Sequence, residues 1–170
     1  MSFFYRSRSA RIVERSPAMM RLATTIALAG YPAGGLVMIL SPDPGQPGAA
    51  WGEAAGLVLI AISLIAFATF AASRLQRIAG EEKGKLDEFE LELRLKARAF
   101  AYNLFSTIVL VGVVYLGIAM DLRVSERAEL WIPADFDDWS GILWGLILYA
   151  FVLPTAYLAW TLRAPPVDEA

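Results

Sequence analysis

Three aspartates lie within four residues of one another in the C-terminal third of the sequence: Asp135, Asp137 and Asp138. Because hard divalent cations favour carboxylate oxygens, such a group could hold a metal ion. Its spacing does not match the ligand positions of an EF-hand loop. The alternative, which we favour, is an acidic loop in which Asp138 or Ser140 caps the helix that follows. We therefore expect no metal site here.

Other kinds of chemistry are limited by two missing residue types, because the sequence contains no cysteine and no histidine. Their absence excludes thiol catalysis, Cys-ligated zinc and iron–sulfur clusters, the usual axial ligand of membrane-embedded haem and the commonest general base. The polar residues inside the apolar stretches are hydroxyls and one amide, most of which can bond to their own helix backbone. We expect no catalytic residue and no cofactor site, while a bound lipid, quinone or pigment stays open.

Four long apolar stretches place much of the chain in lipid. Hydrophobic residues make up 57% of the 170 residues and the mean hydropathy is +0.51, well above that of a soluble domain. A hydrocarbon core about 30 Å thick needs roughly 20 apolar residues in a helix. The sequence predicts an all-α integral membrane protein with four transmembrane helices. The expected spans are residues 22–40, 54–72, 99–120 and 141–162, with outer loops at 41–53 and 121–140.

The basic residues gather on one side of these spans. Five arginines lie in residues 1–21, seven Lys and Arg in residues 73–98 and one after the last span, which makes thirteen of the fifteen. Only Arg123 and Arg127 lie on the other side. By the positive-inside rule we expect both termini in the cytoplasm, including the basic segment 1–21 and the tail 163–170.

The five tryptophans fall near the ends of the expected spans. Their amphipathic rings anchor spans at the level of the lipid headgroups. Some of them could instead be ordinary packing residues. We expect Trp51, Trp131, Trp139 and Trp144 at the outer membrane interface and Trp160 at the inner one.

Small residues mark the surfaces where the spans could pack closely. Helices in lipid associate through close backbone approach, which glycine and alanine permit. Pro32 and Pro154 should kink the first and fourth spans. Such kinks could act as gates, but we favour plain packing, and the same pattern would also serve contacts between copies of the chain. The expected helix-packing residues are Gly30 and Gly34 in the first span, Ala68 and Ala72 in the second, and Gly141 and Gly145 in the fourth.

The segment before the third span predicts a cytoplasmic helix over residues 85–98 that runs without a break into that span. It carries two apolar stripes on roughly opposite faces. A lone helix in water would not expose two stripes, so we expect at least one to contact the N-terminal segment, a second copy or another protein. The alternative is a helix lying along the membrane surface. The expected partner-binding residues are Leu86, Phe89 and Leu93 on one stripe and Leu91 and Leu95 on the other.

The letters LDEFE at residues 86–90, followed by Arg94, Ala97, Ala101 and Tyr102, resemble a stretch of small multi-span bacterial membrane proteins of unknown function. In those proteins an LDExE-like helix leads into a span. The resemblance covers a small part of the chain. It implies a multi-pass protein of the bacterial inner membrane and carries over no catalytic or binding residue.

The expected spans contain no Asp, Glu, Lys, Arg or His, which argues against ion-coupled transport. We expect a non-enzymatic accessory or structural subunit that packs in a larger inner-membrane assembly or with itself. Its expected partners are membrane lipid and other membrane protein subunits or a second copy. Nucleic acid is a poor alternative, because the arginines of the N-terminal segment are needed to set topology. Two alternatives stay open: a component of a transporter or channel, and a membrane-tethered regulator that binds a cytoplasmic partner through helix 85–98.

Overall fold

The computed structural model describes residues 16–42, 45–71, 73–80 and 88–162, and every regular element in this part of the chain is a helix. All of these helices except the short α3 are long and apolar enough to cross a membrane. This confirms the predicted all-α class and the four candidate spans. The predictions for segments 1–15 and 163–170 lie outside the described residues. The helices are α1 (Pro17–Ile39), α2 (Ala49–Ala71), α3 (Arg74–Gly80), α4 (Glu88–Val124) and α5 (Phe136–Thr161).

The first span is longer than its apolar stretch because a capped turn precedes it. Helix α1 begins at Pro17, and the Oγ of Ser16 accepts a hydrogen bond of 3.3 Å from the Met19 N–H. Proline suits the first helical position, where its missing N–H costs nothing. As a result, Arg21 lies inside α1 rather than before it.

The start of α5 differs from the predicted cap. Asp135 is the N-cap and accepts a hydrogen bond of 3.0 Å from the Asp138 N–H, while Asp138 accepts one of 2.8 Å from the Ala134 N–H. The prediction that Asp138 or Ser140 caps this helix is wrong, because the helix begins at Phe136, before either of them. Two of the three aspartates therefore bind backbone N–H groups in the turn that starts the helix.

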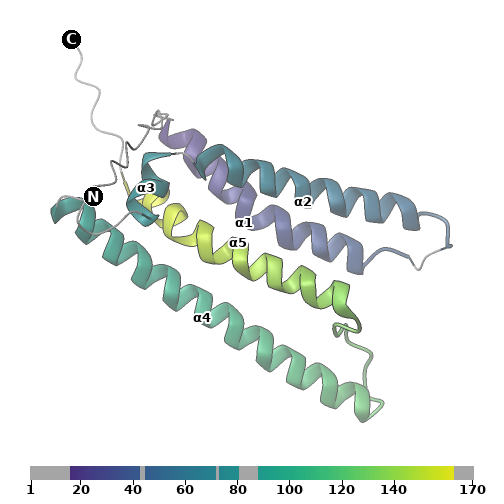
Figure 1. The fold of residues 1–170 in the computed structure, drawn as a ribbon. Coiled ribbons are helices and arrows are strands. Elements are labelled where there is room, and N and C mark those ends of the chain that lie inside the picture. Colours follow the sequence, from purple (N-terminus) through teal and green to yellow (C-terminus); the bar gives the residue numbers. More distant parts are fainter. Residues whose placement is uncertain (1–15, 43–44, 72, 81–87, 163–170) are drawn as a thin grey trace, which may run out of the picture.

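Helices α1, α2 and α5 form the main packed body (Figure 1). Their facing sides meet in a core that consists largely of small and aliphatic side chains around one phenylalanine. Pro32 and Pro154 both lie inside continuous helices of this body. Its buried apolar residues are Met20, Ala23, Ala27, Ala66, Phe70, Leu148, Val152, Ala156 and Ala159.

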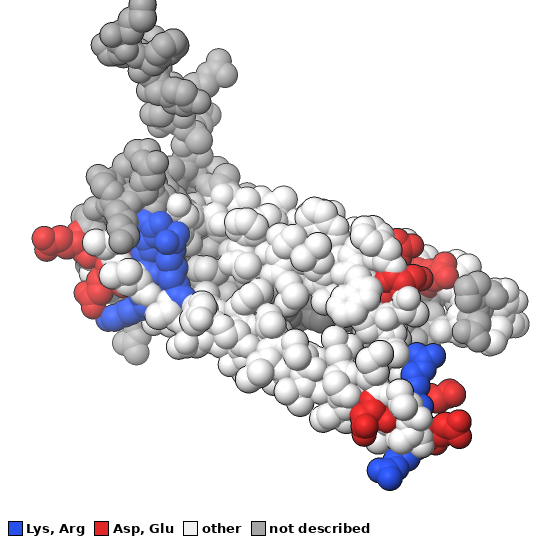
Figure 2. Space-filling model, turned by 60° about the horizontal axis from the view of Figure 1, so that its bottom comes forward, with Lys and Arg blue, Asp and Glu red and all other residues white. Residues whose placement is uncertain are grey.

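Helix α4 runs for 37 residues along one side of this body and makes its main contacts with α5 and α3 (Figure 1). The seven-residue α3, which the sequence analysis did not anticipate, lies at one end of the α4–α5 pair. A second core joins the three helices through Ile78, Ala79, Ala97 and Leu158. Charged side chains gather at the two ends of the molecule, and the face in Figure 2 has a band free of them in between.

Candidate functional site

The contact between α1 and α2 depends on close backbone approach. A side-chain carbon at Gly34 would lie only 2.6 Å from the carbonyl oxygen of Gly56, and one at Gly30 would lie 3.0 Å from Ser63 Cβ. Ser63 also donates a hydrogen bond of 2.7 Å to the carbonyl of Ala27 on α1. Backbone approach of this kind, with an interhelical hydrogen bond, is how helices associate in lipid.

The alanines that were expected to pack in α2 do not take part in this contact. Ala68 is exposed, and Ala72 lies outside the described residues. Buried positions on α2 recur at spacings of three, four and seven, as one face of a helix requires, and Ala68 falls off that face. The buried face of α2 includes Gly56, Ser63, Ala66 and Phe70.

Helix α5 contacts α1 through a tyrosine and a glycine. A side-chain carbon at Gly145 would lie 2.9 Å from Cε1 of Tyr31, so the aromatic ring fills the place of a side chain there. The hydroxyl of Tyr31 donates a hydrogen bond of 2.8 Å to the Gly141 carbonyl. A side chain at Gly141 itself would meet open space. Gly141 thus contributes a hydrogen-bond acceptor to the α1–α5 contact and does not serve to bring the two backbones close together.

Each proline inside a helix removes the donor for one carbonyl in the preceding turn. Pro32 does so for Leu28 on α1, and the hydroxyl of Tyr149 on α5 donates a hydrogen bond of 2.7 Å to that carbonyl instead. Pro154 does so for Ala150 on α5, and no side chain of the described residues donates to the Ala150 carbonyl. Within the described part of the chain, the Leu28 carbonyl therefore has a side-chain donor from a neighbouring helix and the Ala150 carbonyl does not.

Arg21 joins the start of α1 to the end of α5. Its Nε donates to the Ala159 carbonyl at 3.0 Å and its Nη2 to the Leu162 carbonyl at 3.4 Å. The guanidinium also lies 5.7 Å from the ring centre of Trp160. A cation is favourable at this position because the last carbonyls of a helix carry partial negative charge.

Helix α4 is anchored at its N-terminal part and open further along. Glu90, Arg94, Ala97 and Ala101 are buried at spacings of three and four, which places them on one face. From residue 102 to residue 118 no residue is buried. Near the other end of α4, Ala119 is buried again, and the Tyr115 hydroxyl bonds to the Trp131 carbonyl. The helix is therefore packed at both ends and open between them.

The predicted partner-binding residues surround this anchored face. Phe89 is 63% exposed and Leu95 is 54% exposed. Leu91 and Leu93 are half-buried, and Leu93 packs against the second core near α3. Leu86 lies outside the described residues.

An ion pair lies on the exposed surface of the same segment. Lys96 Nζ is 2.7 Å from Glu92 Oε1, one helical turn away. The hydrogen bond and the positive charge of Lys96 lower the pKa of Glu92, and the same contact raises the pKa of Lys96. Both side chains are in solvent, so the pair adds little to stability.

The tryptophans lie near the ends of the spanning helices. Trp51 and Trp139 are exposed near the starts of α2 and α5, and Trp160 is exposed in the last turn of α5. Trp144 is exposed about two turns into α5. Trp131 is half-buried before α5, where its carbonyl accepts a hydrogen bond of 2.8 Å from the Tyr115 hydroxyl.

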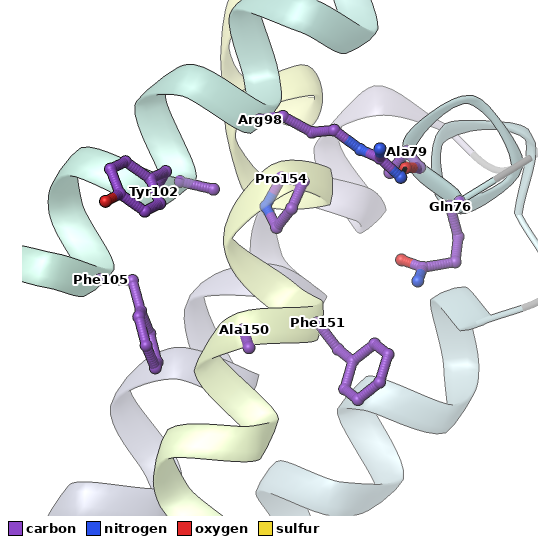
Figure 3. A pocket seen from close by; sticks show the side chains of 10 residues that line it. Gln76, Ala79, Arg98, Tyr102, Phe105, Ala150, Phe151 and Pro154 are labelled. Carbon is purple, nitrogen blue, oxygen red and sulfur yellow. Dashed lines mark hydrogen bonds between the residues drawn. The ribbon is translucent and has the colours of Figure 1, made fainter. Parts of the chain in front are cut away.

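A cavity of about 460 Å³ opens between α3, α4 and α5 (Figure 3). Arg98 Nη2 donates to the Ala79 carbonyl at 3.1 Å, and the hydroxyl of Thr155 donates to the side-chain oxygen of Gln76. These bonds tie α3 to α4 and to α5 beside the cavity. Its lining consists of Gln76, Ala79, Gly80, Arg98, Ala101, Tyr102, Phe105, Ala150, Phe151 and Pro154.

A second cavity of about 630 Å³ lies between α1, α2 and α5. Its lining side chains are apolar except for the Tyr31 hydroxyl and the Trp144 indole N–H, and the Tyr31 hydroxyl is bonded to the Gly141 carbonyl. The cavity is lined by Tyr31, Ile60, Leu64, Phe67, Trp144, Ile147, Leu148 and Phe151.

Several residues of these contacts were absent from the sequence analysis. Pro32 and Pro154 mark the freed carbonyls four residues before them, so those positions could have been read from the sequence. The spacing of Leu75, Ile78 and Ala79 is typical of a helix and could have indicated α3. No signal in the sequence pairs Tyr149 with Leu28.

Within the described ranges, no three His, Cys, Asp or Glu side chains come together in a way that could hold a metal ion. No family model, no curated protein and no solved structure matches this chain.

Proposed function

We propose that this protein is a non-enzymatic accessory subunit of a bacterial inner-membrane assembly, and that it offers α4 to a transmembrane helix of another subunit. The observation that carries the proposal is the contrast within α4. Its N-terminal part buries one face against α3 and α5, while none of the residues 102–118 is fully buried. A long helix that is packed at its ends and open between them presents its middle part to whatever lies beside it in the membrane.

In this proposal both termini and the N-terminal part of α4 lie in the cytoplasm. Thirteen of the fifteen basic residues fall on that side by sequence, and the positive-inside rule favours this orientation. The charge-free band between the two ends of the molecule suits a body that crosses the membrane (Figure 2). The exposed Trp51 and Trp139 at one end and Trp160 at the other suit two membrane interfaces.

Purification of the full chain from its native membranes in mild detergent tests the proposal. Val113 on the open part of α4 is 61% exposed, and Ile62 on α2, which is 45% exposed, is its matched control. We expect the wild-type chain in a complex larger than one chain. Val113→Phe should reduce the amount of complex severalfold, and Ile62→Phe should leave it unchanged. Recovery of a single chain alone, or equal losses of complex in both variants, would rule the proposal out. A complex that contains only copies of this chain would show that the partner of α4 is a second copy and not another protein.

A second candidate function is a membrane-tethered regulator, and the exposure of Phe89 and Leu95 favours it. Large apolar side chains exposed outside a membrane are typical of protein contacts. Replacing both with serine should then abolish capture of a soluble cytoplasmic protein while membrane insertion stays intact. Capture that survives the double substitution would remove this candidate.

A further inference from the structure

The cavity between α3, α4 and α5 has a cation in its wall. Arg98 offers five N–H donors, and its contact with the Ala79 carbonyl uses one of them. The planar guanidinium of Arg98 therefore favours an anionic oxygen group at this end of the cavity.

Deeper in the same cavity lies a carbonyl that lacks its helix donor. Ala150 and Pro154 both line the wall, and Pro154 removes the N–H that would bind the Ala150 carbonyl (Figure 3). At the equivalent place in α1 the Tyr149 hydroxyl supplies the missing donor. A carbonyl that lacks its usual helix donor is unfavourable in a membrane interior, so a hydroxyl from a ligand would be favourable here.

The alignment of α5 against α4 sets how deep in the membrane Ala150 lies. Ala97 and Leu158 meet in the second core, while Phe105 and Ala150 line the cavity, so the two helices run in opposite directions. Residue Ala150 therefore lies about 12 Å deeper in the membrane than Leu158, at about 1.5 Å per residue. Phe105 and Phe151 provide apolar walls at that depth. The cavity volume of about 460 Å³ is modest, which favours one acyl chain over two.

We propose that this cavity binds an anionic lipid with one acyl chain, of the lysophospholipid class. Its phosphate binds Arg98, the free glycerol hydroxyl donates to the Ala150 carbonyl, and the acyl chain lies between Phe105 and Phe151. This site is separate from the open length of α4 and does not depend on the protein partner proposed for it.

Native mass spectrometry of the delipidated full chain in detergent tests the site with four probes. They are 1-oleoyl-lysophosphatidic acid, its analogue without the free hydroxyl (oleoyl propanediol phosphate), monooleoylglycerol without the phosphate, and dioleoyl phosphatidic acid with two chains. We expect lysophosphatidic acid to bind most tightly of the four. Equal binding of monooleoylglycerol or of the two-chain lipid would overturn the proposal, and so would displacement of the lipid by free glycerol 3-phosphate, which would indicate a simple anion site.

Three variants locate the binding. Arg98→Gln should weaken lysophosphatidic acid binding about tenfold, as loss of a charged hydrogen bond predicts. Arg98→Lys should retain most of the binding, which separates loss of charge from a failure to fold. Arg123→Gln, at the other end of the same helix, should change nothing. An Arg98→Gln variant that binds as tightly as the wild type would contradict the site.

Pro154→Ala tests the carbonyl separately. Alanine restores the N–H that binds the Ala150 carbonyl, so the ligand hydroxyl loses its acceptor. Lysophosphatidic acid binding should fall roughly fivefold, and its advantage over the analogue without the hydroxyl should disappear. If the advantage persists in this variant, the assignment of the hydroxyl to Ala150 is wrong.

Discussion

The α1–α2 contact and the open part of α4 are both apolar helix surfaces, yet they differ in how they are built. Between α1 and α2, glycines let the backbones approach and Ser63 bonds across the interface. On α4, side chains at Gly112 and Gly117 would meet open space, and no residue from 102 to 118 is buried. In a membrane, apolar character alone does not distinguish a packed helix from a free one, since lipid is equally apolar. Close approach of the two backbones does distinguish a packed helix from a free one.

The largest effect expected from this comparison is at Gly34. A methyl group there would collide with the Gly56 carbonyl, whereas one at the neighbouring Gly35 would meet nothing. We expect Gly34→Ala to lower the free energy of unfolding by about 2 kcal/mol, as overpacking does. Gly35→Ala should leave it unchanged or raise it by about 0.5–1 kcal/mol through higher helix propensity. Dodecyl sulfate titration followed by circular dichroism measures both, and equal effects would mean that α1 and α2 are not in close contact.

A smaller effect is expected at the hydrogen bond between Tyr149 and the Leu28 carbonyl. Tyr149→Phe should cost about 1 kcal/mol of unfolding free energy. In a Pro32→Ala background the carbonyl regains its helix donor, so the same substitution should cost less than half as much. Unfolding of the four proteins of this double-mutant cycle provides the measurement. Additive costs would show that Tyr149 does not substitute for the donor that Pro32 lacks.

The smallest effect is expected at the exposed ion pair of α4. Because Lys96 lowers the pKa of Glu92, Lys96→Gln should raise that pKa toward its ordinary value in an NMR titration. Any stability from the pair is present above the ordinary carboxyl pKa and is lost as the pH falls through the lowered one. A Glu92 pKa that does not respond to Lys96→Gln would show that the contact does not persist in solution.

The sequence predicted the spanning helices well because length and apolar character are local properties. Helices α1 and α5 begin before the expected spans, since capping by Ser16 and Asp135 extends a helix beyond its apolar residues. Glycines could be recognised as small, but whether a second helix faces each of them depends on the fold. Gly34 meets α2, whereas Gly141 meets open space.

The cavity at Arg98 was harder to predict for a related reason. The cavity forms only where α3 lies against the ends of α4 and α5. Its polar groups come from segments that are far apart in the sequence. The sequence shows that Pro154 removes the donor for the Ala150 carbonyl. It does not show whether a side chain from another helix replaces that donor, as the Tyr149 hydroxyl does for the Leu28 carbonyl.

The proposed contact on α4 is tested most directly by photo-crosslinking in native membranes, with benzoylphenylalanine placed in turn at each position from 102 to 118. We predict crosslinks to another membrane protein that recur every three to four residues, as one helix face in contact requires. Labels at Ile62 on α2 should give none. Uniformly absent crosslinks along α4, or crosslinks without helical period, would show that only lipid covers this helix.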